Sequence, residues 1–249
     1  MRIGVSCIQC FNEDPLKTHV ILKFQPLRQD GIYRYICDKG HQVAMILQQM
    51  HFEVLSEAAV QALTDDYYRD AVATFTAMLE RFYEFYWRVV SLHNKIPQAE
   101  INAAWKRAQR QSERQLGLFI ATYLSEERKA PPLLKEDPHV KLRNNVIHNG
   151  DIPTYENAMM YGQAVLDILA PTLELMRDKY ENAIERMIFN HMQAAQELCL
   201  SEGERTLHMA SGAYPFPISL ARRDGPSINL ERLIKARLEN PTGTMPPPR

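Results

Sequence analysis

The sequence has few cysteines, almost no net charge and no long apolar run, and each absence excludes a class of protein. Four cysteines in 249 residues, with no secretion signal ahead of them, argue against a disulfide framework. No stretch approaches the roughly 18 uncharged apolar residues that a membrane span requires. The sequence therefore predicts a soluble, cytoplasmic protein without a membrane segment.

A formal net charge of −1 argues against a protein that holds nucleic acid by bulk cationic attraction. Any contact with RNA must therefore be local. The basic residues that qualify are Lys106, Arg107, Arg110 and Arg114, followed by Arg128, Lys129, Lys135, Lys141 and Arg143. They form either a basic patch or, for the first four especially, an ordinary solvated helix face.

The N-terminal part of the chain has the pattern of a β-hairpin. Residues 19–24 and 32–36 are rich in β-formers, and Asp30-Gly31 between them is a turn signal. A hairpin of this size cannot bury a core by itself. It needs a staple or a neighbouring element to be stable.

After His41 the pattern becomes helical, which predicts a domain boundary there. The expected helices cover residues 42–63, a long stretch beginning near Asp66, a second long stretch after Pro97, a short helix from Asp137-Pro138 to His148, and a helix from Thr154 to about Leu200. Beyond Ser201 the composition predicts an irregular tail with a short helix at 229–238. The predicted domains are thus a hairpin domain (1–41), a helical domain (42–200) and the tail (201–249).

Three cysteines and a histidine flank this hairpin with the spacing of metal ligands. They are Cys7 and Cys10 before it, and Cys37 and His41 at its far end. Thiolate and imidazole suit tetrahedral Zn²⁺, and four protein ligands would close the site to water, as in a structural site. Binding would then staple the hairpin. The segment resembles a zinc ribbon.

The fourth ligand stays open at this level, because His19 or His51 could replace His41. Cys199 is so distant in the sequence that we expect an ordinary core cysteine. The alternative for the whole set is that Cys7 and Cys10 are free thiols near a frayed terminus.

Arg143-Asn144-Asn145-Val146-Ile147-His148 and the Asn149-Gly150 turn after it resemble the signature of the HEPN superfamily. Its members share an Arg-x(4–6)-His motif, often with a polar residue after the arginine, in a helical bundle. Over residues 66–200 the resemblance implies a mainly α, antiparallel helical bundle. It also implies metal-independent RNA cleavage, a homodimer with a composite site, and a bacterial setting of antiviral defence or toxicity. An antitoxin or another regulatory protein would be a possible partner.

The residue types suit this chemistry, since RNA carries its own nucleophile in the 2′-hydroxyl. His148 can transfer protons at neutral pH, Arg143 can hold the scissile phosphate, and Asn144 can orient either. No carboxylate cluster suited to a two-metal nuclease lies near them, so no cofactor is expected for catalysis. In an ideal α-helix, five steps put Arg143 and His148 about 140° apart, so they would not share one face. The resemblance implies that the motifs of two subunits converge instead.

Other interpretations remain open. Arg143 could be a surface ion pair, and His148 a helix C-terminal residue favoured by the macrodipole. The chain could be a non-catalytic HEPN module that binds nucleic acid or protein. It could be a toxin neutralised by modification of a tyrosine behind the motif, although the first one, Tyr155, is seven residues away. It could also be an enzyme with a catalytic zinc.

Overall fold

The computed structural model describes residues 2–5, 7–13, 23–201, 203, 206–209 and 228–239. The chain divides into two compact units. The N-terminal unit comprises Met1–Gln49 with Ile188–Ser211, and the helical unit comprises Met50–Met187 with Gly212–Arg249. Residues 42–49 and 188–200 thus group with the N-terminal strands, whereas the sequence suggested a boundary after residue 41.

Two small sheets form the N-terminal unit. In the first, β1 (Arg2–Val5) pairs antiparallel with β2 (Lys23–Pro26), and the short helix α1 (Ile8–Glu13) follows β1. In the second, β3 (Ile32–Ile36) pairs antiparallel with β4 (Gln42–Leu47), and β5 (Thr206–Met209) adds in parallel to β4. The antiparallel hairpin is therefore β3–β4, and the predicted pairing of 19–24 with 32–36 is wrong: β2 pairs with β1, and residues 19–22 lie outside the described part.

The prediction of a helix from Gln42 is also wrong over residues 42–47. This run reads Gln-Val-Ala-Met-Ile-Leu, and its last five residues are buried in β4. A continuous apolar run of this length fits a strand covered on both faces as well as it fits a helix. The helix α2 begins later and covers His51–Thr64.

The core of the N-terminal unit lies between the second sheet and the end of a long helix, α7 (Tyr155–Ser201). Ile32, Ala44 and Ile46 of the sheet pack against Met192, Ala195 and Cys199. Cys199 is fully buried, which confirms that it is a core cysteine. The His191 ring also contacts the Leu47 carbonyl, at 3.0 Å.

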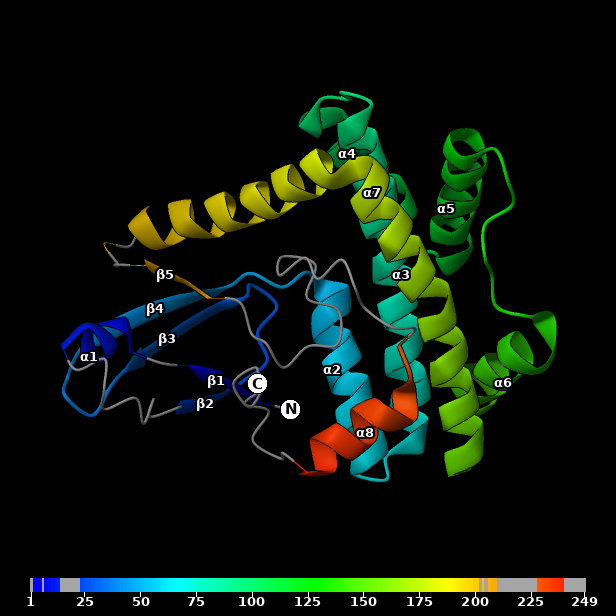
Figure 1. The fold of residues 1–249 in the computed structure, drawn as a ribbon, viewed down its shortest axis with the longest axis horizontal. Helices are drawn as coiled ribbons and strands as arrows, with labels where there is room; N and C mark the ends of the chain where they lie inside the picture. The colour runs from blue at the N-terminus through cyan, green and yellow to red at the C-terminus, as the bar shows by residue number, and fades with distance from the viewer. Residues whose placement is uncertain are drawn as a thin grey trace. The chain divides into compact units, whose positions relative to one another are not determined.

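The helical unit is built around α3 (Tyr68–His93). Its buried residues include Val72, Phe75, Leu79, Phe82, Tyr86 and Val89, the apolar stripe expected from the sequence. Instead of one second long helix, α4 (Gln98–Ala108) and α5 (Ser112–Glu127) follow. Figure 1 shows α2, α3 and the first part of α7 lying together in this unit.

Aromatic and polar contacts give the directions of these helices. Phe52 at the start of α2 packs on Phe82 and Phe85, and α2 ends three residues before α3 begins, so the two helices are antiparallel. Along α5, Gln115 contacts Arg81 and Glu126 contacts Asn94. Hence α5 runs in the same direction as α3.

The segment that carries the motif is a broken helix of three parts: η1 (Glu136–Val140), α6 (Lys141–Asn144) and η2 (Asn145–Asn149). It ends where expected, because Gly150 takes the left-handed conformation at φ +78°. Thr154 then caps α7, its hydroxyl accepting the Asn157 amide at 3.3 Å. Near the other end of the chain, α8 (Leu230–Glu239) confirms the short helix expected in the tail.

The fold is thus mainly α, with a small antiparallel hairpin near the cysteines and His41. Among the described helices, none combines the length and the apolarity that crossing a membrane requires.

Candidate metal centre and candidate catalytic motif

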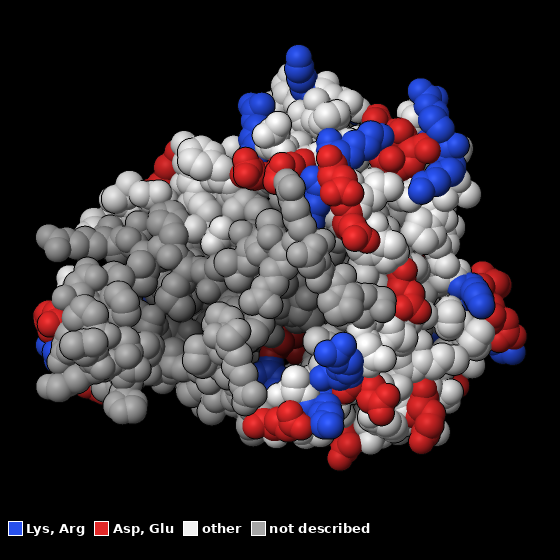
Figure 2. Space-filling view, in the orientation of Figure 1, with Lys and Arg blue, Asp and Glu red and all other residues white. Residues whose placement is uncertain are grey.

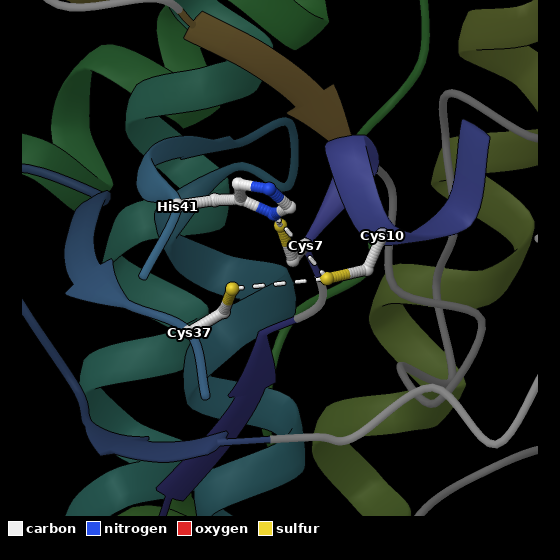
Figure 3. A group of neighbouring side chains, drawn as sticks. All are labelled: Cys7, Cys10, Cys37 and His41. Carbon is white, nitrogen blue, oxygen red and sulfur yellow. Dashed lines mark hydrogen bonds between the residues drawn. The ribbon is translucent and has the colours of Figure 1, made fainter. Parts of the chain in front are cut away.

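Four side chains converge beside the β3–β4 turn. The ligand atoms of Cys7, Cys10, Cys37 and His41 all lie within 4.8 Å of one another. Figure 3 shows the three sulfur atoms and the His41 ring turned toward a common centre. Cys7 is buried and the other three are partly buried. The clustering expected from the sequence is confirmed.

Two short backbone features place these ligands. Cys7 immediately precedes α1 and Cys10 lies within it. Cys37 and His41 close the β3–β4 turn, where the Cys37 amide donates to the His41 carbonyl at 3.0 Å and the Gly40 amide to the Cys37 carbonyl at 2.8 Å. Gly40 has a φ of +82°, a conformation that glycine adopts without the steric cost of a Cβ.

The distances match those of a tetrahedral zinc site. Zinc lies about 2.3 Å from sulfur and about 2.0 Å from nitrogen, so tetrahedral angles put two sulfurs about 3.8 Å apart and a sulfur and a nitrogen about 3.5 Å apart. Here the Cys10 and Cys37 sulfurs are 3.7 Å apart. His41 Nδ1 lies 3.4 Å from Cys10 Sγ and 3.6 Å from Cys7 Sγ. The cluster is consistent with a structural zinc site.

Two of the thiols in the cluster have pKa values shifted by their surroundings. Burial, followed by hydrogen bonds with Cys7 and Cys37, raises the pKa of Cys10 to about 12. Burial opposes ionisation of Cys37 too, but hydrogen bonds from the His41 and Lys39 backbones prevail and lower its pKa to about 7. Sulfurs this close repel one another as thiolates, and a bound divalent cation removes that penalty.

Tyr35 adds an independent observation beside the cluster. Its hydroxyl is buried, with no hydrogen-bond partner among the described residues. Burial and the nearby charges of Cys7, Cys37 and Cys10 raise its pKa. A buried hydroxyl without an acceptor is costly.

Of the two candidate histidines that the structure describes, His41 lies in the cluster and His51 does not. His51 begins α2 and is exposed, and His19 lies outside the described residues. One residue of the site was missed by sequence reasoning. Glu13 Oε1 lies 3.3 Å from His41 Nε2, and its position three residues after Cys10 was the available signal.

At the second candidate site, Arg143 and Asn144 lie together on α6. Arg143 Nη1 donates to Asn144 Oδ1 at 2.7 Å, and Arg143 Nη2 lies 4.0 Å from Glu80 Oε1 of α3. Tyr83 and Tyr161 are also close enough for the Arg143 charge to act on their ionisation, against the burial that raises the pKa of both. The guanidinium is therefore half-buried in a polar network.

His148 lies on η2 and is exposed. Within the described part of the chain, no hydrogen bond holds its ring, so the imidazole is accessible. The turn that carries it is wider than an α-helix: the Gly150 amide bonds to the Asn145 carbonyl, five residues back. The ideal α-helical angle used for the sequence prediction therefore holds from Arg143 to Asn145 but not over the wider turn that carries His148.

The surface of the protein carries charges of both signs. In the described part of the face shown in Figure 2, Lys and Arg side chains alternate with Asp and Glu side chains rather than forming one basic field. Lys106, Arg107, Arg110 and Arg114 are all exposed, and Arg114 also donates to the Arg107 carbonyl at 2.9 Å. A contact with RNA would be local.

The fold and the cluster define a mainly helical protein with an N-terminal Cys3His site. Comparison of the chain with known family models, curated proteins and solved structures finds no match.

Proposed function

We propose that this protein is a metal-independent endoribonuclease of the HEPN type, with a structural zinc ion held by Cys7, Cys10, Cys37 and His41. His148 transfers protons to and from the 2′-hydroxyl and the leaving oxygen. Arg143 holds the scissile phosphate, and Asn144 orients the guanidinium. The expected products carry a 2′,3′-cyclic phosphate and a 5′-hydroxyl.

The observation that carries this proposal is the wide turn over residues 145–150, which carries His148 and begins two residues after Arg143. A turn closed by a bond over five residues takes more residues per revolution than an α-helix, so positions five apart come nearer to the same side. Wide turns of this kind are frequent at functional sites. The exposed imidazole and the half-buried guanidinium of one segment can then face one phosphate.

A homodimer remains part of the proposal, but for a different reason. The wide turn weakens the argument that the motif needs a second subunit to converge. The exposed apolar side chains around the motif supply another argument for a dimer. Ile147, Ile152 and Tyr155 flank His148 within eight residues. Exposed apolar residues that gather beside a polar site are typical of an interface.

The second candidate is a HEPN module that binds RNA or protein without cleaving it. It is favoured by the contacts of Arg143 with Glu80 and Asn144, because a guanidinium that is occupied within the protein has fewer donors for a phosphate. A module that binds RNA would also contact it at α6 and η2, but only catalysis requires the His148 imidazole.

The test is cleavage of labelled single-stranded RNA and tRNA in EDTA by the wild type, His148→Ala, Arg143→Lys and His139→Ala. His148 is exposed, so its loss should leave folding intact. Arg143→Lys keeps the charge and loses the forked donors. His139→Ala is the matched control, since it removes another imidazole from the same broken helix.

We expect wild-type cleavage to survive chelation, to fall at least about 100-fold in His148→Ala and to persist in His139→Ala. RNA binding without cleavage by the wild type would favour the binding module. Full activity in His148→Ala would disprove the proposed site.

A further inference from the structure

Glu13 lies directly behind one of the four candidate metal ligands. Its two carboxylate oxygens have different partners: Oε1 lies 3.3 Å from His41 Nε2, and Oε2 accepts a hydrogen bond from Lys39 Nζ at 2.8 Å. Lys39 and His41 belong to the β3–β4 turn, whereas Glu13 ends α1. The carboxylate therefore joins the two segments that supply the metal ligands.

The helix α1 explains why Glu13 reaches this position. Cys10 and Glu13 are three residues apart on α1, a spacing that places two side chains on the same helix face. Cys10 lies 3.4 Å from His41 Nδ1. The same helix thus presents a sulfur to one nitrogen of the His41 ring and a carboxylate to the other.

The two ring nitrogens of His41 consequently have different environments. Nδ1 faces the sulfurs of Cys7 and Cys10, and Nε2 faces Glu13. A metal ion needs a lone pair on the nitrogen that it binds, so Nδ1 must be unprotonated in the metal-bound state. The proton is then on Nε2, the nitrogen that lies 3.3 Å from Glu13 Oε1.

We propose that Glu13 is a positioning residue of the metal site, which fixes the tautomer and orientation of His41 so that the ring binds zinc through Nδ1. A carboxylate behind a metal-bound histidine makes the ring a better ligand, and losing such a partner typically weakens metal affinity 10- to 100-fold. Lys39 holds the other carboxylate oxygen but is not needed for the tautomer. This inference does not depend on ribonuclease activity.

The experiment measures zinc affinity of the full chain by competition with a chromophoric chelator, for the wild type, Glu13→Ala, Glu13→Gln and Lys39→Met. Co²⁺ absorption reports the geometry of the site, and ¹⁵N NMR of the histidine rings in the zinc-bound protein reports which nitrogen binds. Circular dichroism of each variant checks that it folds.

We expect Glu13→Ala to weaken zinc binding about 10- to 100-fold. Glu13→Gln should lose less, because its amide oxygen can still accept from Nε2. Lys39→Met should lose at most about fivefold, the range of one exposed ion pair. In the wild type, ¹⁵N shifts should identify Nδ1 as metal-bound and Nε2 as protonated.

Three results would overturn the proposal: a chain that binds no zinc, ligation of His41 through Nε2, or wild-type affinity in Glu13→Ala. Equal losses in Lys39→Met and Glu13→Ala would also contradict it, because the bridge between α1 and the turn, rather than the His41 tautomer, would then be what matters. Because RNA cleavage is not measured, failure of the ribonuclease proposal leaves these outcomes unaffected.

Discussion

Glu80 is the residue best placed to control Arg143. Its carboxylate lies 4.0 Å from the guanidinium, with both side chains about one quarter exposed. At this exposure the pair contributes at most about 1 kcal/mol to folding stability. In the proposed ribonuclease, this carboxylate would compete with an RNA phosphate for the same cation, so Glu80 would both orient Arg143 and weaken its hold on a substrate.

We therefore predict that Glu80→Gln in a His148→Ala background tightens RNA binding several-fold, while the free energy of unfolding falls by less than about 1 kcal/mol. Fluorescence anisotropy with a labelled single-stranded RNA measures the binding. Glu84→Gln is the control: it removes the same charge one turn along α3, where Glu84 pairs with Arg81 and Arg88. Weaker binding in Glu80→Gln would show that orientation of Arg143 outweighs the competition.

Among individual residues, the sequence predicted the candidate metal ligands but not the side chains that surround them. Cys7, Cys10, Cys37 and His41 could be found because ligand chemistry restricts residue type and spacing. For Glu13 the sequence offered only its position three residues after Cys10, and the fold is what brings its carboxylate to His41. The contact of Arg143 with Glu80 was hidden for the same reason: 63 positions separate the two residues.

The helices that the structure describes contain two glycines with opposite surroundings. Gly117 lies within α5, and an added Cβ would meet nothing within 4 Å. At Gly162, in α7, a Cβ would come within 2.6 Å of the Phe75 ring and 2.7 Å of Leu230. Gly162 therefore marks the place where α3, α7 and α8 pack too closely for any side chain.

We predict that Gly117→Ala stabilises the protein by about 0.5 to 1 kcal/mol, because alanine restricts the unfolded chain and suits a helix. Gly162→Ala should destabilise it by about 1 to 3 kcal/mol through overpacking. Urea unfolding followed by circular dichroism measures both, and each variant is the other's control. A stabilised Gly162→Ala would show that α8 is not packed there in solution.

Element boundaries were predictable where the sequence contains capping signals. Thr154 before α7 and Gly150 after η2 are such signals, and both helix ends lie where they indicate. β4 has no such signal at its ends. Its short apolar run also has no periodicity that would distinguish a strand from a helix. β5 was missed because a four-residue strand in parallel pairing depends on a partner more than 150 positions away.

The two units should differ in their dependence on metal. The N-terminal unit has a small core around Ile46 and Cys199, and small domains commonly need a staple. The helical unit has the long buried stripe of α3. We predict that a strong zinc chelator exposes residues 1–49 to proteolysis while most of the helical circular dichroism remains.

Two cysteine variants distinguish the effect of losing the metal from the effect of losing a thiol. Cys37→Ala should lose zinc and be cleaved in the N-terminal unit without chelator. Cys199→Ala, which removes a core thiol outside the cluster, should keep one zinc per chain. Loss of the helical signal on chelation would contradict the separation of the two units.

The proposed dimer can be tested through its interface. That interface would bury the exposed apolar residues beside the motif, among them Ile152. Ile152 is 83% exposed, so replacing it costs the folded monomer almost nothing. Buried in a dimer, an aspartate there would be an unpaired charge. Ile152→Asp should therefore weaken dimerisation measured by analytical ultracentrifugation and lower RNA cleavage in parallel, with an unchanged unfolding midpoint for the monomer.

Ile96→Asp is the matched control. Ile96 is 42% exposed and follows the C-terminal end of α3, whereas Tyr155 packs on Tyr68 at the N-terminal end. A helix of 26 residues separates these ends by about 39 Å, so Ile96→Asp should leave the dimer intact. If Ile152→Asp stays dimeric but loses cleavage, Ile152 contacts the RNA instead, and the second subunit must bind elsewhere.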